Sequence, residues 1–248
     1  MGVGIIRPSI KCGARNWNPT LAIPMAPLEY GIREEYLTHV TFHGPVGILE
    51  GYLHLPQDKN PHLGVVICHP HPQMGGDMSN NVVMGICCSL IQVGLITLRF
   101  NFRGVGGSQG TYDEGKGEIE DALAALSFLA AQEEIKQGNV GLAGYSFGAG
   151  VAMKASLKND LPKALSVVAR TRVDFDDDLE RRSSLPMQFV VGDQDRLMPT
   201  DQFSELSSRL TTPPEMHVIP GADHFFRGRE SEVGELVAGF FQRWLTQK

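Results

Sequence analysis

The chain lacks the features that mark several classes of protein. Its 248 residues include four cysteines, and these form neither a Cys-x-x-Cys pair nor a spacing typical of a zinc site. No apolar run approaches the roughly 20 residues that a membrane-spanning helix needs. The formal net charge is −6 and no long basic run occurs, so neither nucleic acid nor a membrane surface is expected as a partner. These absences favour a cytoplasmic protein with buried, reduced thiols, and no metal or cofactor is predicted.

The first 34 residues differ from the rest of the chain. Residues 1–34 contain four prolines and several glycines, and they show no sustained hydrophobic period. We expect an N-terminal extension here that is irregular or partly disordered. Apolar residues make up 42% of the chain, which suffices for one buried core, so residues 35–248 are predicted to form a single domain.

The apolar runs predict an α/β fold. Residues 37–42 and 48–55 are separated by a Gly-Pro turn and predict an antiparallel strand pair. Later apolar runs alternate with helical patterns, which is typical of parallel strands with right-handed crossovers. These runs cover residues 63–68, 95–100, 139–143, 164–169, 187–191 and 216–219. We therefore expect a mostly parallel central sheet with an antiparallel N-terminal strand pair and helices on both faces.

Between the strands, apolar residues recur at helical spacing. Ser79 is predicted to cap a helix whose apolar face runs from Val82 to Ile91 and which ends at Gly94. Further helices are predicted around residues 119–129, 203–210 and 233–245.

One strand leads directly into the pentapeptide Gly144 to Gly148, Gly-Tyr-Ser-Phe-Gly, and a helix of small residues follows. In this context Gly-x-Ser-x-Gly is typical of a sharp turn that lifts one serine out of the sheet. The glycines leave room where the helix packs closely on the strand. Ser146 would lie at the N-terminus of that helix, where free N–H groups favour developing negative charge. The pattern predicts a nucleophile, and the alternative is an ordinary glycine-rich turn.

A serine nucleophile needs a base, and the base needs an acid to orient it. Two histidines follow Ser146 in the chain. His217 falls inside the last predicted strand, so His224, in the loop after that strand, is the candidate base. The loop after the preceding strand holds two candidate acids, Asp193 and Asp195. Serine, acid and base thus each follow a predicted strand, in the chain order that this type of fold requires.

Several stretches together carry a family resemblance from about Glu35 to the C-terminus. They are His69 to Pro72 with Gly75-Gly76, Phe100 to Ser108, Gly117 to Asp121, Gly144 to Gly148, Gly192 to Pro199 and Ala222 to His224. With this set the chain resembles the α/β-hydrolase superfamily. Specifically, it is similar to the small, cap-poor bacterial serine hydrolase branch related to dienelactone hydrolases and prolyl-oligopeptidase catalytic domains.

The resemblance implies roles for the site residues. The acid of the family follows the strand-ending glycine by three residues, which favours Asp195 here, with Asp193 as the reserve and as a turn residue. Asp223, next to His224, is expected to shape its turn. Dienelactone enzymes use a cysteine where this chain has Ser146, and this difference favours an esterase over dienelactone chemistry.

An oxyanion hole needs two backbone N–H groups aimed at the developing charge. One is expected from Phe147, the residue after the nucleophile. Pro70 and Pro72 have no N–H, so elimination and the resemblance both favour His71 for the other. A rival interpretation makes His69 and His71 a metal-binding pair, and the two prolines and the lack of further ligands disfavour it.

Two further segments are expected to be structural. Residues 103–107 suggest a phosphate loop but lack the Gly-Lys-Ser/Thr of a P-loop, so we expect a turn beside the site. Such folds often insert a cap at the position of residues 169–185. Here this segment is short and highly charged, so we expect a solvated loop and no substantial cap.

The sequence as a whole predicts a serine hydrolase. It would cleave a carboxylic ester or related small-molecule acyl compound through an acyl-enzyme, with no cofactor. A peptidase or acyltransferase using the same triad remains an alternative, as does a non-catalytic binding module with this fold. Nothing in the sequence indicates an oligomeric state.

Overall fold

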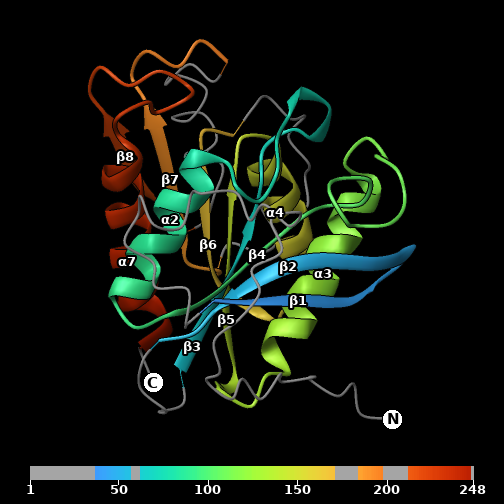
Figure 1. Cartoon of the computed structure of the whole chain (residues 1–248). Helices are drawn as coiled ribbons and strands as arrows, with labels where there is room; N and C mark the ends of the chain where they lie inside the picture. The colour runs from blue at the N-terminus through green and yellow to red at the C-terminus, as the bar shows by residue number, and fades with distance from the viewer. Residues whose placement is uncertain (1–36, 57–61, 171–183, 198–211, 247–248) are drawn as a thin grey trace, which may run out of the picture.

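The computed structural model describes residues 37–56, 62–170, 184–197 and 212–246 (Figure 1). These residues form an eight-stranded sheet with the order β1-β2-β4-β3-β5-β6-β7-β8. The strands are β1 (Leu37–Gly44), β2 (Gly47–His54), β3 (His62–Cys68), β4 (Ile96–Phe100), β5 (Ile135–Tyr145), β6 (Pro162–Val168), β7 (Met187–Gly192) and β8 (Glu215–Ile219). Strand β2 runs antiparallel to both β1 and β4, and all pairs from β4 to β8 are parallel. The predicted mostly parallel sheet with its antiparallel N-terminal pair is confirmed.

Helices cover both faces of this sheet, as predicted (Figure 1). On one face α2 (Asn81–Gln92) packs against α7 (Glu230–Thr246), and on the other α3 (Lys116–Ala130) packs against α4 (Phe147–Lys158). Each face has its own buried apolar cluster, because strands buried on both sides present apolar side chains in both directions. The two clusters fix the carboxyl ends of β3, β5, β7 and β8 at one edge of the sheet.

Three predictions fall outside the described residues. They concern the extension over residues 1–34, most of the charged segment 169–185 and the helix over residues 203–210.

Two element boundaries differ from the predictions. The residue that caps α2 is Asn80, not Ser79: its Oδ1 accepts a hydrogen bond from the amide of Val82 at 3.0 Å. The Ser79 amide instead donates to Asp77 Oδ1 at 2.7 Å, so Ser79 belongs to the turn before the helix. Strand β5 begins at Ile135 rather than near residue 139, since Ile135 pairs with strand β3 before the register shifts.

The glycine-rich turn after β4 is held by buried charge. Arg103 donates to Asp121 from its backbone amide (3.0 Å), its Nε (2.9 Å) and its Nη2 (2.8 Å), and the Asp121 side chain is fully buried. Further along the turn, the Gly107 amide donates to Glu50 Oε1 at 2.7 Å. Each of these groups has a partner within the protein, in agreement with the structural role expected for residues 103–107.

We predict that Asp121→Asn destabilises the protein by about 3–5 kcal/mol, because the buried Arg103 guanidinium loses its buried counter-charge and keeps only the exposed Asp113, at 4.0 Å. Urea unfolding followed by circular dichroism measures the change. Glu120→Gln, one residue away, is the matched control: Glu120 meets Lys158 at 2.8 Å in a half-exposed pair, which is worth less than about 1 kcal/mol. Equal, small losses in both variants would contradict the prediction.

Candidate active site

The turn between β5 and α4 holds Ser146 in a strained conformation. The serine has φ 57° and ψ −118°, a region that a residue with a side chain rarely adopts and that costs about 1–3 kcal/mol. A Cβ atom on Gly144 would lie 2.2 Å from the Gly148 carbonyl oxygen, and one on Gly148 would lie 2.4 Å from the carbonyl oxygens of Cys68 and His69. Only glycine fits at these two positions, as the sequence pattern indicated.

The structure brings Ser146, His224 and Asp195 into one hydrogen-bonded chain. Ser146 Oγ lies 2.9 Å from His224 Nε2, and His224 Nδ1 lies 2.8 Å from Asp195 Oδ2. A carboxylate only accepts, so the proton of the neutral ring lies on Nδ1 and leaves Nε2 to accept from the serine hydroxyl. The three residues are 7%, 6% and 4% exposed, respectively. The arrangement can remove a proton from Ser146.

The aspartates considered as alternatives have local partners. Asp193 Oδ1 accepts from the Gly221 amide at 2.7 Å, and Asp223 Oδ1 accepts from the Phe225 amide at 3.0 Å. Both side chains belong to exposed residues. Only Asp195, among these three, reaches the imidazole ring.

The loop after β3 places His71 beside the nucleophile turn. Phe147 is the first residue of α4, so its amide has no partner within the helix. The ring centroids of His71 and Phe147 lie 4.9 Å apart. Gly148 packs directly against the backbone carbonyls at the end of β3. The two residues predicted to supply the oxyanion amides therefore lie on adjacent segments.

All ring nitrogens of His69 and His71 have protein partners. His69 Nδ1 donates to the Pro70 carbonyl at 2.7 Å, and its Nε2 accepts from the Phe102 amide at 3.1 Å. His71 Nδ1 accepts from the Gln73 amide at 3.2 Å, and its Nε2 lies 3.2 Å from Tyr112 Oη. Within the described ranges, no group of three or more His, Cys, Asp or Glu side chains is placed to hold a metal ion.

Comparison with known proteins identifies the family. The model of the dienelactone hydrolase family matches residues 108–245. The chain belongs to this family. A Rickettsia prowazekii protein, RP471, is 34% identical to it over 209 residues, which cover 81% of this chain and 87% of the relative.

Solved structures agree with this assignment. An α/β serine hydrolase homologue from Coxiella burnetii superposes with a TM-score of 0.73 at 37% identity, covering 82% of this chain and 96% of that chain. XC6422 from Xanthomonas campestris, described as an α/β serine hydrolase without a lid, superposes with a TM-score of 0.74 at 28% identity. The match covers 86% of this chain and 96% of that chain. This member of the dienelactone hydrolase family is therefore a hydrolase of the α/β-hydrolase fold. Within the described residues, no helix has the length and apolar character to cross a membrane.

One residue of the hydrolase's site was not anticipated from the sequence. Tyr145 Oη donates to the carbonyl oxygen of His224 at 2.9 Å, and both residues are buried. Burial, with the nearby carboxylates of Asp195 and Asp223, raises the pKa of the Tyr145 phenol, so it stays protonated and donates. Tyr145 directly precedes Ser146, yet this position does not indicate where its hydroxyl points.

A groove adjoins Asp195 and His224, which are two of its lining residues. Among the described residues, its lining comes from residues 193–197 after β7 and residues 223–225 after β8. The half-exposed side chains of Leu197 and Phe225 form its apolar rim.

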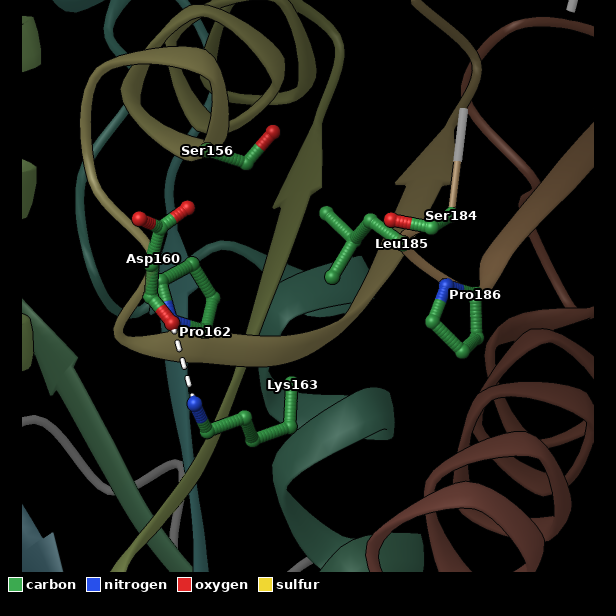
Figure 2. A pocket seen from close by; sticks show the side chains of 7 residues that line it. All are labelled: Ser156, Asp160, Pro162, Lys163, Ser184, Leu185 and Pro186. Atoms are coloured by element: carbon green, nitrogen blue, oxygen red, sulfur yellow. Dashed lines mark hydrogen bonds between the residues drawn. The ribbon is translucent and has the colours of Figure 1, made fainter. Parts of the chain in front are cut away.

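A second hollow lies at the opposite edge of the sheet, where β6 and β7 begin (Figure 2). There Lys163 Nζ donates to the Asp160 carbonyl at 3.1 Å. Its lining residues are Ser156, Asp160, Pro162, Lys163, Ser184, Leu185 and Pro186, a set without a nucleophile paired to a histidine. The candidate active site is thus the carboxyl edge of the sheet.

His69 makes the stability of this hydrolase depend on pH. Burial lowers its pKa from 6.5 to about 4, so below pH 6.5 the unfolded chain binds a proton that the folded protein does not. The stability that the neutral His69 ring gives the folded protein is therefore fully present above pH 6.5. It falls by up to about 1.4 kcal/mol per pH unit as the pH drops from 6.5 to 4.

We predict that between pH 7 and pH 5 the wild type loses about 2 kcal/mol more stability than His69→Gln, which has no titrating ring. Urea unfolding at the two pH values measures this difference. The buried His54 is present in both proteins, so its effect on stability cancels in the difference between them. Parallel losses in the two proteins would rule out the assignment.

Proposed function

We propose that the protein is a serine hydrolase that cleaves a carboxylic ester, or a related small-molecule acyl compound, through an acyl-enzyme. The observation that carries this proposal is the unbroken chain of hydrogen bonds from Ser146 Oγ through the His224 ring to Asp195 Oδ2, at 2.9 and 2.8 Å. It lies at the carboxyl edge of the sheet, where enzymes of open α/β folds bind their substrates. Membership of a hydrolase family supports a catalytic role over a binding role.

The reaction follows from this geometry. Ser146 Oγ attacks the acyl carbon while His224 Nε2 takes the hydroxyl proton, and Asp195 stabilises the imidazolium that forms. The carbonyl oxygen gains negative charge, which the amides of Phe147 and His71 stabilise together with the N-terminus of α4. The C–O bond to the leaving group then breaks, and His224 gives the proton to the leaving oxygen. Water attacks the acyl-enzyme by the reverse proton transfers and releases the acid.

Two features favour an ester as the substrate. The nucleophile is a serine, where the dienelactone enzymes that the chain resembles have a cysteine. The groove beside His224 is lined mostly by polar and charged residues, and among them the apolar Leu197 and Phe225, which are 53% and 52% exposed, offer apolar contact to an alcohol group. A peptidase or acyltransferase would use the same triad and differ in leaving group or acceptor. The reaction needs no cofactor and suits a cytoplasmic enzyme.

We predict that the wild type hydrolyses p-nitrophenyl esters and that Ser146→Ala loses at least about a thousandfold in kcat/KM. A series from the acetyl to the dodecanoyl ester measures the rate and gives the depth of the acyl site. A fluorophosphonate probe should label wild type stoichiometrically and leave Ser146→Ala unlabelled. An unlabelled, inert wild type would instead support the non-catalytic binding module.

We predict that Asp195→Asn lowers kcat by roughly ten-thousandfold, because the ring would be held in the wrong tautomer. Asp193→Asn is the matched control: the amide oxygen can still accept from Gly221, so its rate should stay close to wild type. Steady-state kinetics on p-nitrophenyl acetate distinguish the two carboxylates. A large loss in Asp193→Asn with an active Asp195→Asn would reverse their roles.

A further inference from the structure

Three rings gather on the oxyanion side of Ser146. His71, Tyr112 and Phe147, here called the aromatic wall, come from the loop after β3, the loop after β4 and the start of α4. Their centroids are 5.2 Å (His71–Tyr112), 4.9 Å (His71–Phe147) and 5.9 Å (Tyr112–Phe147) apart. Phe102 supports the wall from the buried side, edge-on to Phe147 at 6.0 Å. All three members are half-buried, so each keeps some surface open to solvent.

The hydrogen bonds of the wall determine where its protons lie. The Gln73 amide donates to His71 Nδ1, so the proton of the neutral ring is on Nε2. Nε2–H therefore donates to Tyr112 Oη, which accepts. The hydroxyl hydrogen of Tyr112 is left to point elsewhere, and within the described part of the chain no group accepts it. Burial, with the charges of Glu118 and Glu114, raises the pKa of Tyr112, so the hydrogen is retained.

The geometry of the tetrahedral intermediate indicates which part of the substrate faces each side of the site. Its carbon carries the serine oxygen, the oxyanion, the leaving oxygen and the acyl substituent. The leaving oxygen must face His224 Nε2 to receive a proton, so the alcohol lies on the His224 side of Ser146, and His224 is also one of the residues that line the groove with Leu197 and Phe225. The oxyanion faces the amides of His71 and Phe147. The acyl substituent takes the remaining direction, which points away from His224.

We propose that the aromatic wall binds the acyl group, and that the preferred substrates are esters of aromatic acids with an oxygen acceptor that takes a hydrogen bond from Tyr112 Oη. A flat acyl ring packs on aromatic faces at centroid distances of about 4.5–7 Å. The spare hydroxyl hydrogen adds selection for an oxygen on that ring. Tyr112 is thus a specificity-determining residue. This inference rests on the proposed esterase function.

Matched substrates separate the ring from the acceptor. Methyl 4-methoxybenzoate and methyl 4-ethylbenzoate have nearly the same shape, and only the former has an oxygen acceptor; the 3-substituted pair covers the other ring position. In Tyr112→Phe the ratio of kcat/KM for the methoxy ester to that for the ethyl ester should fall about two- to tenfold in at least one pair. Loss of the hydrogen bond between Tyr112 and His71 affects both esters of a pair, so it cancels in the ratio. Intrinsic reactivity cancels because the same two esters are compared in both proteins.

Tyr52→Phe, which removes a hydroxyl on β2, is the control and should leave the ratio unchanged. Wild type should also prefer methyl benzoate to methyl cyclohexanecarboxylate by about two- to tenfold. The inference is wrong if Tyr112→Phe leaves the ratio unchanged for both pairs, or if wild type shows no preference for the aromatic ring. In either case, Ser146-dependent hydrolysis of p-nitrophenyl acetate would still support the proposed esterase function. Loss of both activities with an unlabelled serine removes the proposed function itself.

Discussion

The site depends on the close approach of backbone to backbone at Gly144 and Gly148. Any side chain at Gly144 would strike the first turn of α4, and any at Gly148 would strike the end of β3. Because both contacts are with main-chain atoms, neither can be relieved by a rotamer change. The same contacts hold Ser146 at its positive φ, which an isolated turn would relax. The helix N-terminus, the loop bearing His71 and the serine are thus positioned by one packing constraint.

A second set of contacts positions Asp195 and His224 relative to each other. The loop after β7 is bonded to the loop after β8 through the Gln194 amide and the Ala222 carbonyl at 3.0 Å. Asp193 adds its hydrogen bond to Gly221, and Tyr145 fixes the His224 carbonyl. None of these groups need touch a substrate. They restrict two loops that would otherwise hold Asp195 and His224 loosely, and the proposed proton transfer requires such precise positioning.

Much of this arrangement could be predicted from the sequence, because strands buried on both faces are continuous apolar runs, and Ser146 and Asp195 each follow one. His224 follows β8, a short edge strand with alternately exposed residues, which its alternation and its place after the helical pattern of residues 203–210 still indicate. The residues that tie the loops together could not be predicted. Whether Asp193 or Asp195 faces the ring depends on the turn after Gly192, where a Cβ would lie 2.1 Å from the Ala222 carbonyl. Asn80 and Ser79 are both good helix caps, and the Asp77 side chain decides between them by bonding the Ser79 amide. Which of two neighbouring residues takes a role is thus decided by tertiary contacts, and these cannot be read from the local sequence.

His224, the proposed base, lies 78 residues further along the chain than the serine that it contacts. During synthesis the strands up to β5 and the nucleophile turn emerge from the ribosome well before β8 and α7, which carry His224 into place. A chain that has emerged only as far as the nucleophile turn has Ser146 without His224, and the hydrogen bonds among Ser146, His224 and Asp195 require the loops after β7 and β8 as well. The proposed activity therefore needs the sheet complete through β8, so its appearance in a newly made chain would report the end of folding rather than its beginning.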